Sequence, residues 1–140
     1  MSIRIFYDEI KFRVRNKKRV IKLIEKVISE EKRKPGDLNF IFTNDEEERK
    51  INKEFLKQDL FTDVISFSYN DGIILNGEIY ISIDTVKFNA NNYKVSLNKE
   101  VLRIIIHGLL HVCGYEDKSV WEKKVMVKKE NFWMSEFNYM

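Results

Sequence analysis

The sequence predicts an α+β fold in which a mixed sheet of four strands packs against about five helices. Short runs rich in β-branched and aromatic residues, typical of strands, alternate with longer stretches whose apolar residues recur every three or four positions, typical of helices. One late helix is apolar on nearly all sides and therefore needs other layers to cover it. With 140 residues, the chain is long enough for one hydrophobic core. We therefore expect residues 1–140 to form a single domain.

The first half of the chain predicts two strands and two helices. Strand composition or helical apolar spacing marks three of these elements, at residues 3–7, 17–31 and 38–42. Pro35 and Gly36 predict a turn before the second strand. Asn44 begins a further helix, because it can cap free N–H groups and the four acidic residues that follow face the positive end of the helix dipole. We expect this helix to run to about Leu56.

The second half predicts two more strands and then three helices. The strands are expected at 64–68 and 78–83, and the helices at 85–92, 97–113 and from 120 onward. Turn residues at 70–72 and 76–77 separate the two strands. Gly114 is expected to end the apolar helix in a left-handed conformation. Ser119 and Glu122 have the spacing of a capping box, which opens the last helix.

Composition excludes several classes of protein. No apolar run approaches the roughly 20 residues that span a bilayer, so we expect no membrane partner. The first residues lack the apolar core and cleavage site of a signal peptide. The chain has one cysteine, Cys113, which cannot form an internal disulfide and fits a reducing compartment. We therefore expect a cytoplasmic protein.

Basic residues are concentrated in two parts of the chain. Residues 11–34 contain eleven Lys or Arg against three Glu, although the net charge of the whole chain is only +3. The second cluster consists of Lys118, Lys123, Lys124, Lys128 and Lys129. Such clusters attract phosphates and nucleic acid. A lysine-rich helix face in contact with water has the same composition, so the clusters fit an RNA partner without requiring one.

Three residues near the end of the apolar helix have the spacing of zinc ligands. His107 and His111 are four residues apart, about 40° around a helix axis, and can aim both imidazoles at one point. Gly114 then lets the chain reverse, so that Asp117 can return to the same point. Two nitrogens, one carboxylate oxygen and an open position describe a catalytic site for one zinc ion. Cys113 lies on another side of the helix and should face the core.

Ordinary core or surface histidines are the alternative interpretation of this motif. His107 and His111 are, however, the only two histidines of the chain, and both lie on an apolar helix. Burying two imidazoles there is costly unless a partner such as zinc satisfies them. The metal interpretation is therefore favoured.

The same spacing occurs in the zinc proteases whose motif is written H-E-x-x-H-x-x-G-x-x-H, so the helix is zincin-like. Two positions differ. Gly108 replaces the glutamate that acts as general base in those proteases, and Asp117 replaces the last histidine. Peptide hydrolysis therefore lacks its proton carrier. A zinc ion can still acidify water and polarise a phosphoryl oxygen without this glutamate. The motif therefore predicts a zinc hydrolase that is not a standard protease.

Three motifs, TDVISF at residues 62–67, GEIYIS at 77–82 and HGLLHVCGYED at 107–117, resemble in their order those of the YbeY family. Residues 107–117, HGLLHVCGYED, resemble its H-G-x-L-H-L-x-G-Y-D-H signature. Residues 62–67, TDVISF, are similar to T-D-V-L-S-F, and residues 77–82, GEIYIS, to G-D/E-I-x-I-S. Members of this family are bacterial metal-dependent endoribonucleases of 16S rRNA maturation and ribosome quality control.

The resemblance implies a zinc-dependent, single-strand-specific endoribonuclease acting in 16S rRNA 3′-end maturation. Its partners would be the 16S rRNA precursor and components of the ribosome or its small subunit. Thr62, Asp63 and Ser66 would supply polar groups to the substrate cleft beside the metal. A structural role is equally open for Asp63, which can cap a turn or fix the end of a strand.

Two departures from the family pattern weaken the catalytic interpretation. Asp117 stands where the family usually has a third histidine, and Leu56 stands where it often has an arginine thought to assist phosphate chemistry. A carboxylate lowers the net charge of the site and so its power to acidify water. Lys57, or a lysine of either cluster, is a candidate substitute for the arginine. A non-catalytic, zinc-containing binding protein of ribosome biogenesis is therefore the alternative function.

Overall fold

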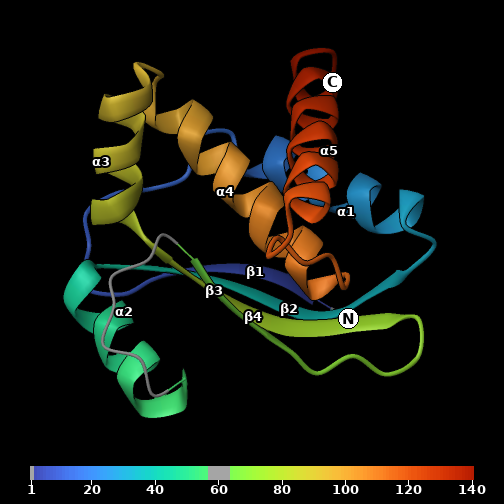
Figure 1. Cartoon of the computed structure of the whole chain (residues 1–140), viewed down its shortest axis with the longest axis horizontal. Coiled ribbons are helices and arrows are strands. Elements are labelled where there is room, and N and C mark those ends of the chain that lie inside the picture. Colours follow the sequence, from blue (N-terminus) through green and yellow to red (C-terminus); the bar gives the residue numbers. More distant parts are fainter. Residues whose placement is uncertain (1, 57–63) are drawn as a thin grey trace.

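The computed structural model describes residues 2–56 and 64–140, which form one α+β unit with a four-stranded sheet and helices gathered mainly on one of its faces (Figure 1). The elements are β1 (Ser2–Tyr7), α1 (Lys17–Glu30), β2 (Lys34–Thr43), α2 (Asp45–Ile51), β3 (Val64–Ser68), β4 (Ile74–Ser82), α3 (Ile83–Tyr93), α4 (Leu97–Val112) and α5 (Val120–Asn138). A π-helical turn (η1, Asn52–Leu56) follows α2. The predicted fold class is confirmed.

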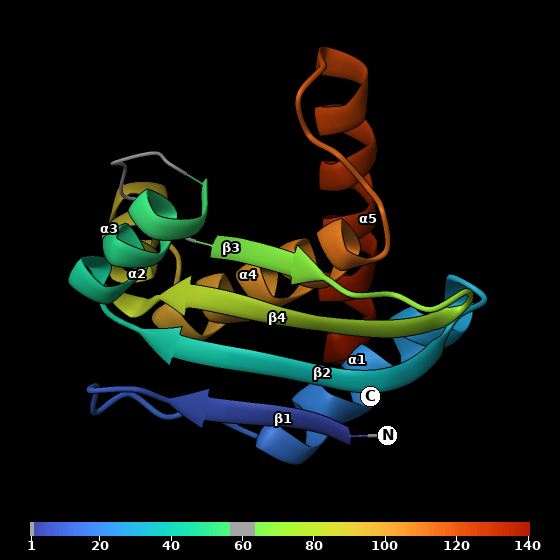
Figure 2. The same cartoon turned by 90° about the horizontal axis from the view of Figure 1, so that it is seen from below.

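The strands lie in the order β1-β2-β4-β3, as Figure 2 shows. β1, β2 and β4 are parallel, whereas β3 runs antiparallel to β4. The register places Ile5, Phe40, Ile79 and Ser66 side by side across the sheet. Phe40 and Ile79 are completely buried under the helices, so this row carries the core from the middle of the sheet to β3 at its edge. On β3 the row ends at Ser66, whose side chain is a hydroxyl group.

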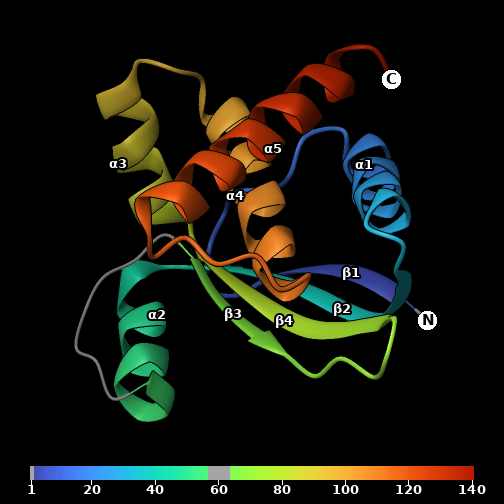
Figure 3. The ribbon, with the colours of Figure 1, turned by 45° about the vertical axis from the view of Figure 1, so that its right-hand side comes forward.

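The apolar helix α4 lies between the sheet and α5 (Figure 3). Its buried positions lie on several sides of the helix, as expected for an element covered from two directions. Fully buried members of the core come from α1, β2, β4 and α4, for example Leu23, Phe42, Ile81 and Leu109. Among the described residues, no helix combines the length and apolar character that crossing a membrane requires. α4 is therefore the centre of the core.

Two predicted turns are wrong, and both belong to strands. Pro35 and Gly36 lie in β2, and the dipeptide at 76–77 lies in β4. A Cβ on Gly36 would collide with Oδ1 of Asn76, and this same oxygen accepts a hydrogen bond of 2.8 Å from the N–H of Asp37. Gly36 and Asn76, which are residues typical of turns, thus allow β2 and β4 to pair closely. The reversal after α1 is instead made at Lys32, whose φ is 58°.

The predicted helix signals are confirmed. The side chain of Asn44 accepts a hydrogen bond of 2.9 Å from the N–H of Glu47, and Ser119 with Glu122 forms the full capping box. Gly114 has a φ of 108° and follows the last residues of α4. The turn at 70–72 is also present, with Gly72 at a φ of 60°. The residues that begin and end these helices were therefore predictable from their local chemistry.

Gly108 sets how closely α4 approaches the sheet. A Cβ at this position would lie 2.7 Å from Cγ2 of Ile79 and 3.1 Å from Cγ2 of Val64. Ile79 is completely buried and has little room to move. The space that a side chain would need at position 108 is therefore filled by β3 and β4.

We predict that Gly108→Ala destabilises the protein. The methyl group strains a packed core by about 1–3 kcal/mol. This strain outweighs the gain of up to about 1 kcal/mol in helix propensity. The free energy of unfolding, measured by urea titration, should fall, whereas that of Ser135→Ala, at an exposed position of α5, should hardly change. A more stable Gly108→Ala protein would contradict the close packing.

Candidate metal centre

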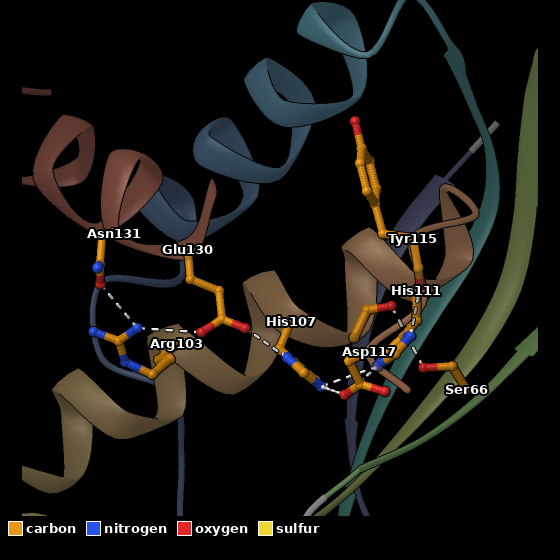
Figure 4. Close-up of polar contacts among 9 residues, drawn as sticks. Ser66, Arg103, His107, His111, Tyr115, Asp117, Glu130 and Asn131 are labelled. Atoms are coloured by element: carbon orange, nitrogen blue, oxygen red, sulfur yellow. Dashed lines mark hydrogen bonds and ion pairs between the residues drawn. The ribbon is translucent and has the colours of Figure 1, made fainter. Parts of the chain in front are cut away.

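The side chains of His107, His111 and Asp117 meet beside the C-terminal half of α4 (Figure 4). The two Nε2 atoms of the histidines are 3.0 Å apart. Oδ2 of Asp117 lies 3.3 Å from Nε2 of His107 and 3.4 Å from Nε2 of His111. All three residues are partly buried. The structure thus brings together the three residues that the spacing singled out.

The loop that carries Asp117 returns because of the way α4 ends. The N–H of Gly114 donates to the carbonyl of His111, and the N–H of Tyr115 donates to the carbonyl of Leu110, each at 3.0 Å. Together with the positive φ of Gly114, this pair of bonds is the Schellman arrangement that reverses a chain after a helix. Asp117 is consequently carried back beside the helix face that holds the histidines.

His111 is oriented by the backbone of the same loop. Its Nδ1 lies 2.9 Å from the carbonyl oxygen of Tyr115. Since a carbonyl only accepts, Nδ1 must carry the proton, and Nε2 then presents its lone pair to the centre. The hydroxyl of Tyr115 donates to Oε2 of Glu31 at 2.9 Å, which ties the loop to the end of α1.

His107 is oriented by a buried carboxylate on α5. Its Nδ1 lies 2.5 Å from Oε2 of Glu130, a residue only 5% exposed. Nη1 of Arg103 donates to Oε1 of Glu130 and to Oδ1 of Asn131, both at 3.2 Å. Arg103 therefore compensates the buried charge, and the carboxylate holds His107 with Nε2 toward the centre.

Glu130 and Arg103 were not predicted from the sequence. One signal was present, because Glu130 occupies a core position of α5 in line with Met126, Trp133 and Met134, all buried. An acidic residue in such a stripe needs a buried partner. Which partner it meets depends on how α5 crosses α4, and spacing within α5 does not give that.

These three donor groups fit a zinc ion. Two imidazole nitrogens that both present lone pairs at 3.0 Å repel each other, and a cation between them removes this cost. Bonds of about 2.0–2.1 Å at tetrahedral angles separate ligand atoms by about 3.3 Å, close to the three distances found here. Nitrogen and carboxylate donors are among those that zinc accepts. Within the described ranges the cluster has these three members, as in a site that keeps a position open.

Cys113 faces the core, as predicted, and is 7% exposed. Burial, with a smaller contribution from the carboxylate of Glu31, raises the pKa of its thiol to about 11. The thiol therefore stays protonated at neutral pH, whereas a metal ligand needs the thiolate. This chemistry agrees with a centre built from nitrogen and oxygen.

A groove of about 310 Å³ opens between α3, α4 and α5 at the centre. His107 and Asp117 line it, and so does Lys123 of α5. Lys123 is exposed. A phosphate-bearing ligand in this groove would therefore meet the metal centre and a lysine together.

The predicted cleft residues are only partly covered by the structure. Thr62 and Asp63 lie outside the described residues. Ser66 lies on β3 beside α4, where its hydroxyl donates to the carbonyl of Gly108 at 3.4 Å. Its role in a substrate cleft stays a prediction. Leu56 ends the π-helical turn.

Fold and site together define a class of α+β proteins that present two histidines from a buried helix and a carboxylate from the loop that follows it. The sequence model described as Endoribonuclease YbeY matches residues 5–138. The chain is 42% identical to the endoribonuclease YbeY of Flavobacterium psychrophilum, with 90% of each chain covered. It is 40% identical to that of Amoebophilus asiaticus, covering 95% of this chain and 91% of the relative.

A structural comparison agrees. The solution structure of TM1509 from Thermotoga maritima matches 97% of this chain and 89% of its own, with a TM-score of 0.67 and 28% identity. The chain therefore belongs to the endoribonuclease YbeY family.

We predict that Glu130→Gln weakens zinc binding by about 10–100-fold, the usual effect of losing a carboxylate behind a ligating histidine. The amide keeps the shape of the side chain but removes its charge. Affinity can be measured by competition with a chromophoric chelator. Glu136→Gln, at an exposed position of the same helix, is the matched control and should leave the affinity unchanged. Equal affinities for the two variants would contradict the role of Glu130.

Proposed function

We propose that this protein is a zinc-dependent endoribonuclease that cleaves single-stranded RNA as a single domain. One zinc ion would be held by His107, His111 and Asp117. The observation that carries the proposal is the fixed orientation of both imidazoles, each with Nδ1 occupied and Nε2 turned to the carboxylate of Asp117. Membership of the endoribonuclease YbeY family supports RNA as the substrate.

The residues around the centre have different roles in the proposed reaction. A zinc ion bound there supplies Lewis acidity, which polarises a phosphoryl oxygen and lowers the pKa of water. Glu130 and the carbonyl of Tyr115 keep both histidines in the ligating tautomer. Lys123, on the wall of the same groove, is placed to attract the phosphate backbone.

The packing at Gly108 argues against a protease. A zinc protease of this spacing needs a glutamate at this position as general base. Here β3 and β4 occupy that space, with Cγ2 of Ile79 2.7 Å from where a Cβ would lie. A side chain at position 108 would thus conflict with the sheet. Phosphoryl chemistry, in which the metal itself provides the activation, is the better match to this centre.

For the biological substrate, we propose the 16S rRNA precursor, cleaved during 3′-end maturation and in ribosome quality control. The ribosome or small-subunit components would be its partners, and the cytoplasm its location. The three sequence motifs that resemble the family support this assignment. The endoribonuclease names of the relatives support it as far as RNA cleavage.

A second candidate function is a non-catalytic, zinc-containing binding protein of ribosome biogenesis. Two observations favour it. Leu56 replaces the arginine often found in the family, and the guanidinium of Arg103, which also lines the groove, is already bonded to Glu130 and Asn131. This protein would bind zinc and RNA but would not cleave RNA.

We predict that His111→Ala and Asp117→Asn abolish both zinc binding and RNA cleavage, because each removes one of three ligands. Asp117→His restores the usual family ligand and should keep both properties. Zinc content can be measured by metal analysis of the purified proteins, and cleavage by gel electrophoresis of a labelled single-stranded RNA. Circular dichroism of each variant checks that the fold is retained.

The same set of proteins separates the two candidate functions. Cleavage that disappears with a chelator and returns with zinc supports the endoribonuclease. Zinc-loaded wild-type protein that binds RNA without cutting it would support the binding protein. Cleavage that persists in metal-free His111→Ala would overturn the proposed role of the metal.

A further inference from the structure

The outer face of α5 combines exposed lysines with exposed apolar side chains. Lys123, Lys124 and Lys128 are all exposed. Trp121 is 73% exposed and Phe132 is 54% exposed. We call these five residues the α5 ridge. Two large aromatic rings in solvent, interleaved with lysines, are unusual on a helix whose other side is packed in the core.

The α5 ridge is continuous with the groove of the metal centre. Lys123 lines both that groove and a hollow of about 520 Å³ on the crest of the helix. Lys124 and Lys128 line this second hollow and also a third one, of about 640 Å³, on the side of α5 away from the metal groove. Trp121 and Phe132 line the third hollow as well. A chain that leaves the metal centre can therefore cross α5 through neighbouring depressions.

The three lysines of the α5 ridge contribute positive charge along this path. In the described part of the chain, no carboxylate pairs with Lys123, Lys124 or Lys128. The carboxylate of Glu122 is occupied by the N–H of Ser119 in the capping box. These three ammonium groups remain available for an anionic ligand.

The acidic residues of the third hollow do not reverse this balance. Glu31 accepts from Lys129 at 3.1 Å and from the hydroxyl of Tyr115 at 2.9 Å. Glu30 lies exposed on the α1 side of the hollow, opposite the lysines of α5. The lysine side of the path is thus the one that a polyanion would follow.

We propose that the α5 ridge is a binding track for single-stranded nucleic acid that leads to the metal centre. This inference rests on the proposed function and extends it by locating where the RNA strand lies beyond the cleavage point. Lys123, Lys124 and Lys128 hold successive phosphates, and Trp121 and Phe132 offer their faces to bases. Lysines along the backbone with aromatic stacking platforms are the combination by which proteins bind single strands without reading sequence.

The first test removes the exposed ring. Trp121→Ala should weaken binding of a fluorescein-labelled oligothymidylate of about 20 nucleotides, longer than typical single-strand sites, by roughly 5-fold to 100-fold. Fluorescence anisotropy of the zinc-loaded protein measures the affinity without cleavage, since the probe is DNA. Trp121→Phe should recover most of it. Unchanged binding in Trp121→Ala would overturn the stacking role.

The second test compares two matched lysine pairs. Lys124→Ala with Lys128→Ala removes two charges four residues apart from the α5 ridge, and Lys22→Ala with Lys26→Ala does the same on the exposed face of α1. We expect the α5 pair to weaken binding at least 10-fold and to reduce the slope of log affinity against log salt by about 1.4. The α1 pair should change affinity less than 2-fold. Equal losses would overturn the proposal, because they would indicate general charge attraction.

A third measurement separates this inference from the proposed function. Trp121→Ala and the Lys124→Ala/Lys128→Ala pair should cleave a dinucleotide at the wild-type rate, because so short a substrate reaches only the metal groove. On long single-stranded RNA, both variants should show a raised KM. Equal losses on both substrates would overturn the track. If no substrate is cleaved by the wild type but the oligothymidylate results hold, the proposed function fails and the track stands.

An amphipathic helix with tryptophan and lysine can also bind a membrane surface. Vesicles of phosphatidylcholine and phosphatidylserine test this alternative by sedimentation. We expect no co-sedimentation of the wild type. Vesicle binding that is lost in Trp121→Ala, with oligothymidylate binding unchanged, would replace the nucleic-acid track by a lipid surface.

Discussion

Each imidazole of the metal centre has one nitrogen already engaged within the protein, and this constraint determines what the other nitrogen can do. His107 is held through Nδ1 by the carboxylate of Glu130, and His111 by the carbonyl of Tyr115. With both Nδ1 atoms protonated, the two Nε2 atoms face each other and Asp117 as acceptors. That arrangement is unfavourable for a protein alone and favourable around a cation.

α5 contributes to the centre from one side and to the solvent surface from the other. Its buried side contacts α4 and carries Glu130, which fixes His107. Its outer side carries the lysines and rings of the α5 ridge. Because one rigid helix presents both sides, a strand bound on the ridge would be held at a constant position relative to the metal.

The sequence was sufficient wherever the chemistry is local. His107, His111 and Asp117 are close in the chain, so helical spacing and Gly114 predicted their meeting, and Asn44 and Ser119 predicted helix starts through caps that involve only neighbours. The sequence was not sufficient where a contact depends on segments that are far apart in the chain. Glu130 reaches His107 only because α5 crosses α4, and Gly36 meets Asn76 only because β2 pairs with β4. In that last case the residues typical of turns serve close strand pairing.

X-ray absorption at the zinc edge of the zinc-loaded protein reports which atoms bind the metal. Two imidazole nitrogens and one carboxylate predict a first shell of nitrogen and oxygen only, at about 2.0–2.2 Å, with the multiple-scattering signature of two histidines. The spectrum of Asp117→His should then gain a third imidazole. A scatterer at about 2.3 Å would indicate sulfur and a different set of ligands. That result, or the absence of bound zinc, would contradict a zinc centre formed by His107, His111 and Asp117.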